Sequence, residues 1–595
     1  MNKKIKNIIF VLLLALLILP LFQHAAKFFN AGKLNGDFIL AERPQFSRST
    51  WIDGTFQAGF DRYIEDHIGF RNFFVRLNNQ IEFTFFDEVN AEGIVKGKSN
   101  ILYEHDYIRA FAGGDFIGGK TITRKMEKLK FLQNHLKEKF DIDLILILEP
   151  SKARIEPQFI PDHYLENGIS ISNYEYFKQK ATDLKVDFID LNKYLVEISD
   201  TIQYPVYPPY GIHWSEHTMG FITDTLIRYI EKKRNIDLPG FSVKNRIVGD
   251  SISDSDYDAG KTCNLLFRLP QNELPYPFFT FYDDSTKAKP AVLAVADSYY
   301  WNIFNTRVPQ NLFTNTSFWY FNAKVYPDFY YGAKWTKDLD IKKEVEKQDV
   351  ILLSITERFL YKFAWQFVEQ LYEIYTPPFT GNIIEKKEDV IRNYSTWFDE
   401  LVERANAENI SLVGLIHKEA SFLAEKENYE VYLSWYGAEY YKNMIQMSSS
   451  WDSAVRVKAI KNSQSYNDQL TGEANWIFKE NMPDIYTKFT TIKNMENAIF
   501  SDSHWLKTVA EKAQKYNMPV EMMVSVDAEY VVENDPALVN FVNNVRLLEK
   551  TIKNNPDWLK KVGEKAQKKG ISIDEMLRMD AKYIIKEQQK KQKHE

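Results

Sequence analysis

The sequence predicts an α/β domain, with helices on both faces of a parallel sheet, followed by an all-α domain of four tandem repeats. Two observations lead to this fold class. Up to about residue 380, short apolar runs typical of buried strands alternate with helical patterns, as in parallel sheets. Beyond residue 385 such runs are absent, and one tryptophan-centred pattern recurs four times. A chain of 595 residues has room for both domains.

The N-terminus combines a positive segment with an apolar one. Three lysines within the first six residues precede the apolar residues 7–22, and the small-residue sequence "HAA" at 24–26 is a weak cleavage site. We therefore expect an uncleaved signal anchor with a short linker at residues 1–34. The rest of the chain would lie in the periplasm, anchored to the inner membrane. A cleaved signal peptide and a buried core helix are the alternatives.

Composition and charge exclude several classes of function. The formal net charge is −6, so we expect no nucleic-acid partner. The single cysteine, Cys263, excludes an internal disulfide and a thiolate zinc cluster. His213 and His217 have the i, i+4 spacing of a zinc site on a helix, but the sequence shows no third or fourth ligand. We therefore expect neither a metal nor a cofactor.

Four apolar runs define the expected sheet. Each is short and continuous, as expected for a strand that is buried on both faces. They are residues 143–149, 186–191, 291–298 and 349–356, with helical patterns at 124–139, 173–184 and 215–233. The α/β domain is expected to span residues 35–380, and its chemistry should gather at the carboxyl ends of the strands.

Polar side chains follow three of these runs. Asp297 and Ser298 end the third, where doubly wound hydrolases place a nucleophile, although the same pair is also a common helix cap. Lys152 and Arg154 follow the first run, and Glu357 follows the fourth. Because the carboxyl ends of parallel strands meet at one edge of a sheet, we expect these side chains to lie at that edge.

Six stretches occur in the order found in a known family. They are "GFR" (69–71), "VKGKSNILY" (95–103), "PSKARIEPQFIP" (150–161), "HWSEHT" (213–218), "ADSYYW" (296–301) and "DVILLSITERFL" (349–360). Over roughly residues 50–365 the sequence resembles the periplasmic alginate O-acetyltransferase family (AlgX/AlgJ-like), whose catalytic domain is related to SGNH hydrolases.

The resemblance implies an SGNH-hydrolase-like fold and an O-acetyltransferase that acts on hydroxyls of an exopolysaccharide or cell-envelope glycan. It implies Ser298 as the nucleophile and His213 as its base. It also implies a membrane-embedded O-acyltransferase as the partner that supplies acetyl groups. Around the substrate we expect a cationic residue for the oxyanion, Arg154, and three further contacts: Lys152, Trp214 and Tyr299.

One position departs from the family pattern. The family has an aspartate two residues before the histidine, and here that residue is Gly211. An acid normally fixes the imidazole tautomer and stabilises the imidazolium. Either another acid has taken this role, or a Ser-His dyad works alone, or catalysis has been lost. The candidates for the acid are Glu357 first, then Asp297, and then Glu216.

These options leave three functions open. The first is the acetyltransferase, which uses a sugar hydroxyl as the acceptor. A carbohydrate acetyl esterase is the second, because a Ser-His site can use water instead. The third is a catalytically impaired glycan-binding or assembly protein, which the glycine at position 211 favours.

The tandem repeats are expected at residues 385–585, ahead of a polar tail at 586–595. Four tryptophans are separated by 54, 54 and 53 residues: Trp397, Trp451, Trp505 and Trp558. Positions −6, +4 and +8 from each tryptophan are aliphatic, which predicts a buried helical stripe together with the indole. Position +22 is acidic, which we expect to be a cap or solvated, and position +25 is aromatic. The array is expected to dock an envelope protein partner.

Overall fold

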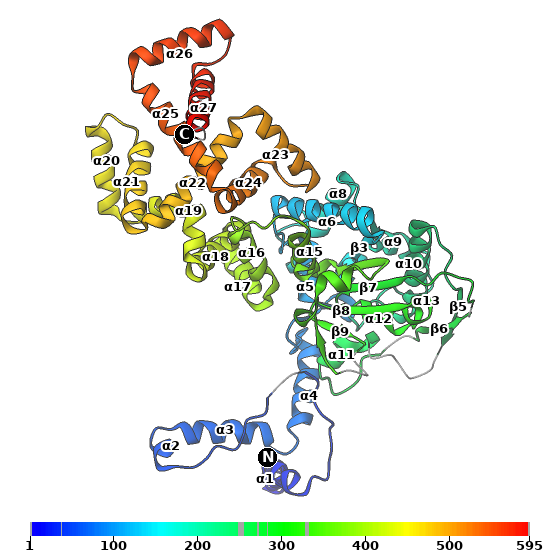
Figure 1. Ribbon diagram of the computed structural model, residues 1–595. Helices are drawn as coiled ribbons and strands as arrows, with labels where there is room; N and C mark the ends of the chain where they lie inside the picture. The colour runs from blue at the N-terminus through cyan, green and yellow to red at the C-terminus, as the bar shows by residue number, and fades with distance from the viewer. Residues whose placement is uncertain are drawn as a thin grey trace. The chain divides into compact units, whose positions relative to one another are not determined.

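The computed structural model describes residues 3–36, 39–247, 255–270, 273–282, 284–327 and 332–592. The chain divides into two compact units (Figure 1). The α/β unit comprises Met1–Phe116 and Leu136–Ala364, and the helical unit comprises Ile117–His135 and Trp365–Glu595. The sequence analysis put the boundary at 380–385 and gave the second domain no part of residues 117–135.

The α/β unit is built on a seven-stranded sheet with the order β10-β9-β8-β7-β11-β3-β4. Its strands are β3 (Asp143–Glu149), β4 (Phe188–Asp190), β7 (Ala291–Ala296), β8 (Asn315–Tyr320), β9 (Lys324–Tyr326), β10 (Lys334–Trp335) and β11 (Val350–Thr356). The five strands from β8 to β4 are parallel, which confirms the expected α/β class. The sheet is mixed because β9 and β10 join antiparallel at one edge, and the sequence analysis missed these strands and β8.

Two of the parallel strands, β3 and β11, are buried along their whole length, which explains their continuous apolar sequences. Alternate residues of β3, β7 and β11 share one core with two helices. These are α10 (Met219–Arg234) and α12 (Tyr300–Asn305). The core fixes the strand ends from which the site residues extend.

Smaller elements surround this sheet. Two antiparallel pairs stand apart from it: β1 (Ile94–Lys96) with β2 (Leu102–Glu104), and β5 (Phe241–Ile247) with β6 (Pro275–Phe281). The remaining α-helices of this part of the chain are α1 (Lys3–Ala26), α2 (Arg48–Ile52), α3 (Thr55–His67), α4 (Arg71–Ile81), α5 (His105–Ala112), α7 (Lys152–Ile155), α8 (Asn173–Asp183), α9 (Leu191–Ser199), α11 (Asp258–Thr262), α13 (Val308–Leu312) and α14 (Ile341–Val345). α6 (Gly119–Phe140) contributes residues to both units.

The helical unit contains helices that recur with the period of the tryptophans. After α15 (Phe367–Tyr375) and α16 (Ile383–Asn393), a first group begins with α17 (Ser395–Glu408), α18 (Leu412–Glu427) and α19 (Tyr429–Met447). The next groups are α20 (Ser449–Lys461), α21 (Tyr466–Asn481) and α22 (Pro483–Phe500), then α23 (Ser503–Lys515), α24 (Val520–Asn534) and α25 (Pro536–Lys553). The last described group is α26 (Pro556–Lys569) and α27 (Ile573–Gln592).

The aliphatic positions of the repeat are buried more deeply than its tryptophans. Position +4 is buried in every copy, as are the alanines at position +8 and the isoleucines at position −6. The four tryptophans are half-buried, and Trp451 and Trp558 pack against these buried positions. The acid at position +22 is neither a cap nor free. It pairs with a cation 15 residues earlier in all four copies: Arg404–Glu419, Lys458–Glu473, Lys512–Asp527 and Lys565–Asp580.

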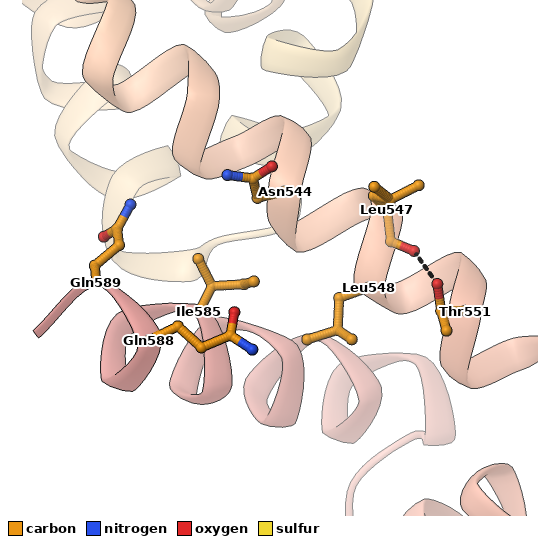
Figure 2. Close-up of a pocket in the computed structure, with 7 residues that line it drawn as sticks. All are labelled: Asn544, Leu547, Leu548, Thr551, Ile585, Gln588 and Gln589. Atoms are coloured by element: carbon orange, nitrogen blue, oxygen red, sulfur yellow. Dashed lines mark hydrogen bonds between the residues drawn. The ribbon is translucent and has the colours of Figure 1, made fainter. Parts of the chain in front are cut away.

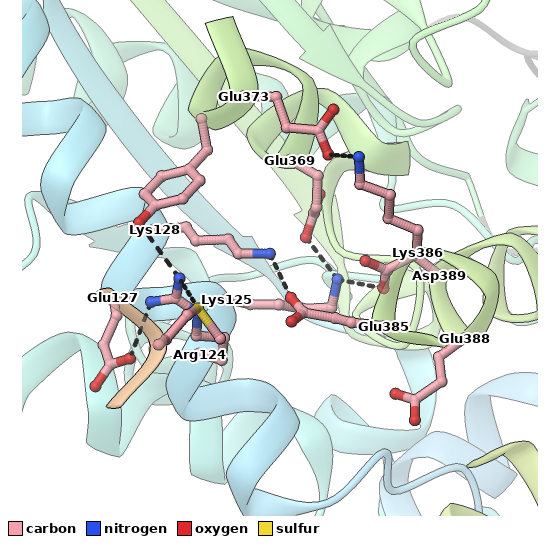
Figure 3. Close-up of polar contacts among 12 residues, drawn as sticks. Arg124, Lys125, Glu127, Lys128, Glu369, Glu373, Glu385, Lys386, Glu388 and Asp389 are labelled. Carbon is pink, nitrogen blue, oxygen red and sulfur yellow. Dashed lines mark hydrogen bonds and ion pairs between the residues drawn. The ribbon is translucent and has the colours of Figure 1, made fainter. Parts of the chain in front are cut away.

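The helical unit also holds a buried ion network (Figure 3). Lys125 Nζ lies 2.6 Å from Glu369 Oε1 and 2.8 Å from Asp389 Oδ1, and Arg392 Nη1 lies 3.0 Å from the same Asp389 oxygen. Lys128 pairs with Glu385 beside them. Residues 117–135 therefore supply the cations that neutralise carboxylates of α15 and α16.

Near the C-terminal end of the same unit, α25 and α27 enclose a cavity of about 320 Å³ (Figure 2). Its lining combines aliphatic side chains with uncharged polar ones: Asn544, Leu547, Leu548, Thr551, Ile585, Gln588 and Gln589. Because charged side chains are missing from this lining, the cavity is chemically unlike the ion network.

Candidate active site

Ser298 lies two residues after the end of β7, at the carboxyl end of the parallel sheet. Its side chain is half-buried, and its Oγ lies 2.9 Å from His213 Nε2. The His213 side chain is 18% exposed, so solvent reaches the imidazole. The two residues lie 85 positions apart in the sequence, and the fold brings them to hydrogen-bonding distance.

The other imidazole nitrogen contacts a carboxylate that the sequence analysis did not consider. His213 Nδ1 lies 2.6 Å from Asp258 Oδ2. The second oxygen, Asp258 Oδ1, accepts hydrogen bonds from the backbone N–H groups of Ile212 (2.8 Å) and Ala259 (2.7 Å). A carboxylate has no proton to donate, so Nδ1 carries the imidazole proton and Nε2 accepts from Ser298 Oγ–H. The three side chains have the geometry of a Ser-His-Asp triad.

Gly211 explains how Asp258 reaches the imidazole. A Cβ at position 211 would lie 2.8 Å from the carbonyl oxygen of Ser255 and 2.5 Å from Pro208 Cγ. The glycine thus leaves room for the backbone of residues 255–256, which leads directly into the start of α11 and Asp258. The absence of a side chain at position 211 and the position of Asp258 thus belong to one packing arrangement.

Glu357 and Asp297, the expected candidates for the acid, have other partners. Glu357 is buried and pairs with Arg154, whose Nη2 lies 2.5 Å from Glu357 Oε1. Asp297 accepts from the backbone N–H of Thr356 (2.8 Å), from its hydroxyl (2.5 Å) and from Tyr299 N–H (3.0 Å). Burial raises the pKa of Asp297, while these donors and the nearby imidazole lower it. The assignment of the orienting acid to either residue was therefore wrong.

The third candidate, Glu216, also lies off the imidazole. Its Oε1 accepts from Ser255 Oγ at 3.1 Å, so it contacts the segment that leads to Asp258. The expectation that strand-end side chains share one edge holds for Arg154 and Glu357, because β3 and β11 are adjacent parallel strands. Arg154 is thereby held in an ion pair, and it also donates to Ser172 Oγ at 3.2 Å. The oxyanion contact of Arg154 stays a prediction.

Lys152 contacts the loop before the histidine. Its side chain is fully buried, and Nζ donates to the carbonyl oxygens of Pro208 (2.7 Å), Pro209 (2.8 Å) and Gly211 (3.0 Å). Burial lowers the pKa of Lys152 to about 8, against the opposing charges of Glu156 and Asp258. Pro208 and Pro209 have no backbone N–H group that could anchor the loop, and the three hydrogen bonds from the Lys152 ammonium group hold it instead. Lys152 is a positioning residue, and its expected role in substrate contact is not what the structure shows.

Tyr299 and Trp214 also position the histidine and do not face the substrate. Both side chains are 0% exposed, and their rings pack edge to face with centroids 5.0 Å apart. Tyr299 donates its hydroxyl to the carbonyl oxygen of Ile212 at 2.6 Å, and burial raises its pKa well above the usual value. A side chain without exposed surface cannot stack on a sugar. The expectation that Trp214 and Tyr299 contact the substrate therefore does not hold.

His217, the second histidine of the i, i+4 pair, lies against an aromatic ring. His217 is buried, and its ring packs edge to face against Phe221. Burial lowers its pKa. No group of three or more histidine, cysteine, aspartate or glutamate side chains suited to a metal ion occurs in the described residues.

No sequence signal pointed to Asp258. It lies 45 residues after His213, in a short acidic segment without strand or helix periodicity. The one usable clue was negative. A glycine in place of the family aspartate leaves a gap that another carboxylate can fill, and the four aspartates of residues 250–258 were the nearest unassigned cluster.

The comparisons with known proteins extend over less than half of this chain. No protein-family profile matches it, and no curated protein matches it. Among solved structures, the O-acetyltransferase domain of Pseudomonas putida AlgJ is similar at 17% identity with a TM-score of 0.32, over 47% of this chain and 98% of that one.

Two further structures are similar to the same extent. Pseudomonas aeruginosa AlgX has 12% identity and a TM-score of 0.31, over 46% of this chain and 67% of that one. Bacillus cereus PatB1 has 14% identity and a TM-score of 0.29, over 45% and 96%. AlgJ and AlgX give their names to the family that the sequence resembles. TM-scores this low add nothing to the contacts described above, from which the chemistry is inferred.

Proposed function

We propose that the protein is a serine-dependent O-acetyltransferase with an SGNH-hydrolase-like site formed by Ser298, His213 and Asp258. The observation that carries the proposal is the chain of contacts from Ser298 Oγ to His213 Nε2 (2.9 Å) and from His213 Nδ1 to Asp258 (2.6 Å). This geometry is what activation of a serine hydroxyl requires. The 26% exposed carboxylate of Asp258 stabilises the imidazolium that forms when His213 takes a proton.

The reaction has two halves. His213 Nε2 removes the proton from Ser298 Oγ as the oxygen attacks the acetyl carbonyl of the donor. The donor's leaving group takes this proton, and an acetyl ester of Ser298 remains. In the second half His213 removes the proton of a sugar hydroxyl, whose oxygen attacks the acetyl-serine. Ser298 Oγ then leaves and regains the proton, and the acetyl group is on the sugar.

We propose a polysaccharide of the cell envelope or an exopolysaccharide as the acceptor, and a membrane-embedded O-acyltransferase as the source of acetyl groups. The six sequence stretches that resemble alginate O-acetyltransferases support this choice. The apolar helix α1, with a mean hydropathy of 2.6, supports a location in the periplasm with an anchor in the inner membrane.

The test is an acetyl-ester reporter assay with the full-length protein, with and without an oligosaccharide acceptor. We expect acetylated oligosaccharide and an acetyl-Ser298 peptide in the mass spectrum. If acetate is released equally with and without the oligosaccharide, and no acetylated oligosaccharide forms, the protein is a carbohydrate acetyl esterase. An inert protein with intact fold would leave the glycan-binding alternative.

The helical repeats support a second role, the docking of an envelope protein partner. The aromatic side chain at position +25 is exposed in every copy: Phe422 (58%), Trp476 (61%), Tyr530 (60%) and Tyr583 (67%). Exposed aromatic side chains are typical of interaction surfaces. A photocrosslinking residue at position 530 should therefore capture an envelope protein in cells. One in place of the exposed Glu439 should not, and equal capture at both positions would contradict the proposal.

A further inference from the structure

The helices that follow α1 in the α/β unit carry an exposed apolar surface. We call residues 40–74 the collar; they comprise the chain before α2, then α2 and α3, and the first turn of α4. Neither α2 nor α3 has a single buried residue. In Figure 1 these helices run outward from the N-terminal end of α4, next to α1.

The collar is unusually aromatic for a segment with no buried helix. Ring contacts run through it in one series: Phe46–Trp51, Phe46–Phe56, Phe56–Phe60, Phe60–Tyr63 and Tyr63–His67. Several of its large apolar side chains remain exposed: Phe46 (67%), Trp51 (52%), Ile52 (73%), Ile64 (44%) and Phe74 (48%). Water is a poor solvent for such a surface, which indicates a further binding surface.

The collar is joined to the carboxyl end of α1. His24 Nδ1 lies 2.7 Å from the carbonyl oxygen of His67. Gly69 packs so closely on α1 that a Cβ there would overlap the carbonyl oxygen of Pro20. The ring of Phe29, just after α1, packs against Phe70 and Phe73 at 5.7 and 6.0 Å. The apolar surface of the collar therefore continues from the end of the candidate membrane span.

We propose that the collar binds the lipid surface itself, with Phe46, Trp51 and Ile52 inserted at the boundary between headgroups and acyl chains of the outer leaflet of the inner membrane. This rests on the proposed membrane anchoring by α1. Amphipathic helices that lie in the interface bury an apolar face and keep charges on the other. Tryptophan and other aromatic side chains concentrate at this depth.

The charges of α3 agree with this orientation. Asp61, Arg62 and Glu65 lie between the aromatic positions of the helix and are exposed. Asp66 pairs with Arg71 of α4 at 3.0 Å, and it accepts from the backbone N–H of Ala41 at 2.8 Å. The turn between α3 and α4 is thus held by polar contacts, while the apolar side chains of the collar have lipid as their partner.

The test uses the full-length chain in lipid nanodiscs, with one fluorescent label per protein. Cys263 is buried, and Cys263→Ala gives a background in which only an added cysteine reacts. An environment-sensitive probe is placed at Phe46→Cys or Ile52→Cys, with Phe22→Cys in α1 as the membrane reference and Lys232→Cys on α10 as the control. Quenching is measured with a lipid that carries a nitroxide near the top of its acyl chain.

We expect the probes at positions 46, 52 and 22 to be quenched and the probe at position 232 to be unaffected. In the Ile52→Cys protein, Phe46→Ser should weaken the quenching, and the matched change Asp61→Ser should not. If position 22 is quenched and positions 46 and 52 are not, the anchor is real and the collar proposal fails. Absence of quenching at position 22 would overturn the anchoring as well. Quenching at 46 and 52 that requires a co-embedded membrane protein would identify a protein occupant and also contradict lipid binding.

Discussion

The repeats of the helical unit and the candidate site of the α/β unit build their polar contacts in opposite ways. In the helical unit, each repeat joins a cation to an acid 15 residues later, as in Lys512–Asp527 and Lys565–Asp580. In the α/β unit, the contacts of His213 join residues 45 and 85 positions away. A local contact recurs with the sequence period and can be read from it. A contact between distant loops depends on how the whole sheet is assembled, so it leaves no periodic trace.

The first prediction tests the long-range contacts at their centre. Ser298→Ala removes the hydroxyl that is proposed to carry the acetyl group, and we expect acetyl transfer to fall by about 10⁴-fold or more. The protein should remain folded because the serine side chain is half-buried and small. The reporter assay, together with circular dichroism, checks both points. Unchanged transfer by this variant would falsify the covalent mechanism.

The second prediction separates Asp258 from the other carboxylates. Asp258→Asn should leave His213 in the wrong tautomer and lower the rate by about 10³–10⁴-fold. Asp224→Asn, at a half-exposed carboxylate of α10 that pairs with Arg228 along the helix, is the matched control and should retain full activity. An Asp258→Asn protein as active as the control would show that the 2.6 Å contact has no part in the reaction.

A third prediction contrasts buried and exposed ion pairs within the helical unit. Lys125→Ala strands Glu369 and part of Asp389 without a cation, and we expect it to cost about 3–5 kcal/mol of unfolding free energy. Lys512→Ala breaks a pair whose lysine side chain is 46% exposed and should cost about 1 kcal/mol or less. Urea unfolding of the full chain measures both. A loss for Lys125→Ala as small as that expected for Lys512→Ala would mean that the network in Figure 3 does not stabilise the unit.

The fourth prediction concerns position 211. If the site were an impaired dyad, Gly211→Asp would supply the family's carboxylate and raise activity. The structure predicts the opposite, because a Cβ there collides with Ser255 and displaces the segment that carries Asp258. A displacement near 1 Å can cost about 100-fold in rate. Gly211→Asp should also fail to rescue Asp258→Asn, and rescue in that double variant would show that the two loops can exchange the acid freely.

The smallest expected effect is a pH dependence of the helical unit. Burial raises the pKa of Asp389, but the positive charges of Lys125, Arg392 and Lys128 outweigh this effect. The pKa is therefore lowered to about 2. A folded-state pKa below the usual 3.8 stabilises the unit above about pH 4, and this contribution is lost as the pH falls toward 2. The Lys125→Ala protein should lose less stability over that interval. Parallel melting curves of the two proteins between pH 5 and 2 would contradict this linkage.

Much of the fold could be predicted from the sequence, and the reason is burial. The continuous apolar runs at β3, β7 and β11 identified three central strands, since both faces of each are covered. The edge strands β9 and β10 were missed because they are two or three residues long and carry no such pattern. The repeat period predicted the helices of the second unit, although the tryptophans turned out half-buried and the aliphatic positions buried.

The candidate site was predictable only in part. Ser298 and His213 were named through the resemblance to alginate O-acetyltransferases, and they lie 2.9 Å apart. Lys152, Trp214 and Tyr299 were expected to contact the substrate. All three are buried supports of the histidine loop, and residue type alone cannot distinguish these two environments. Asp258 was missed because its partner is fixed by tertiary packing.

The close contact at Gly211 also has an evolutionary consequence. A side chain at this position and the present path of residues 255–256 exclude each other, so the two loops are epistatic. An acid at position 211 would require a shift of the other loop as well, so the substitution alone should lower activity. A motif search that requires an acidic residue two places before the histidine would classify this chain as catalytically inactive. Its imidazole nevertheless has a carboxylate at 2.6 Å, supplied by a residue 45 positions later in the sequence.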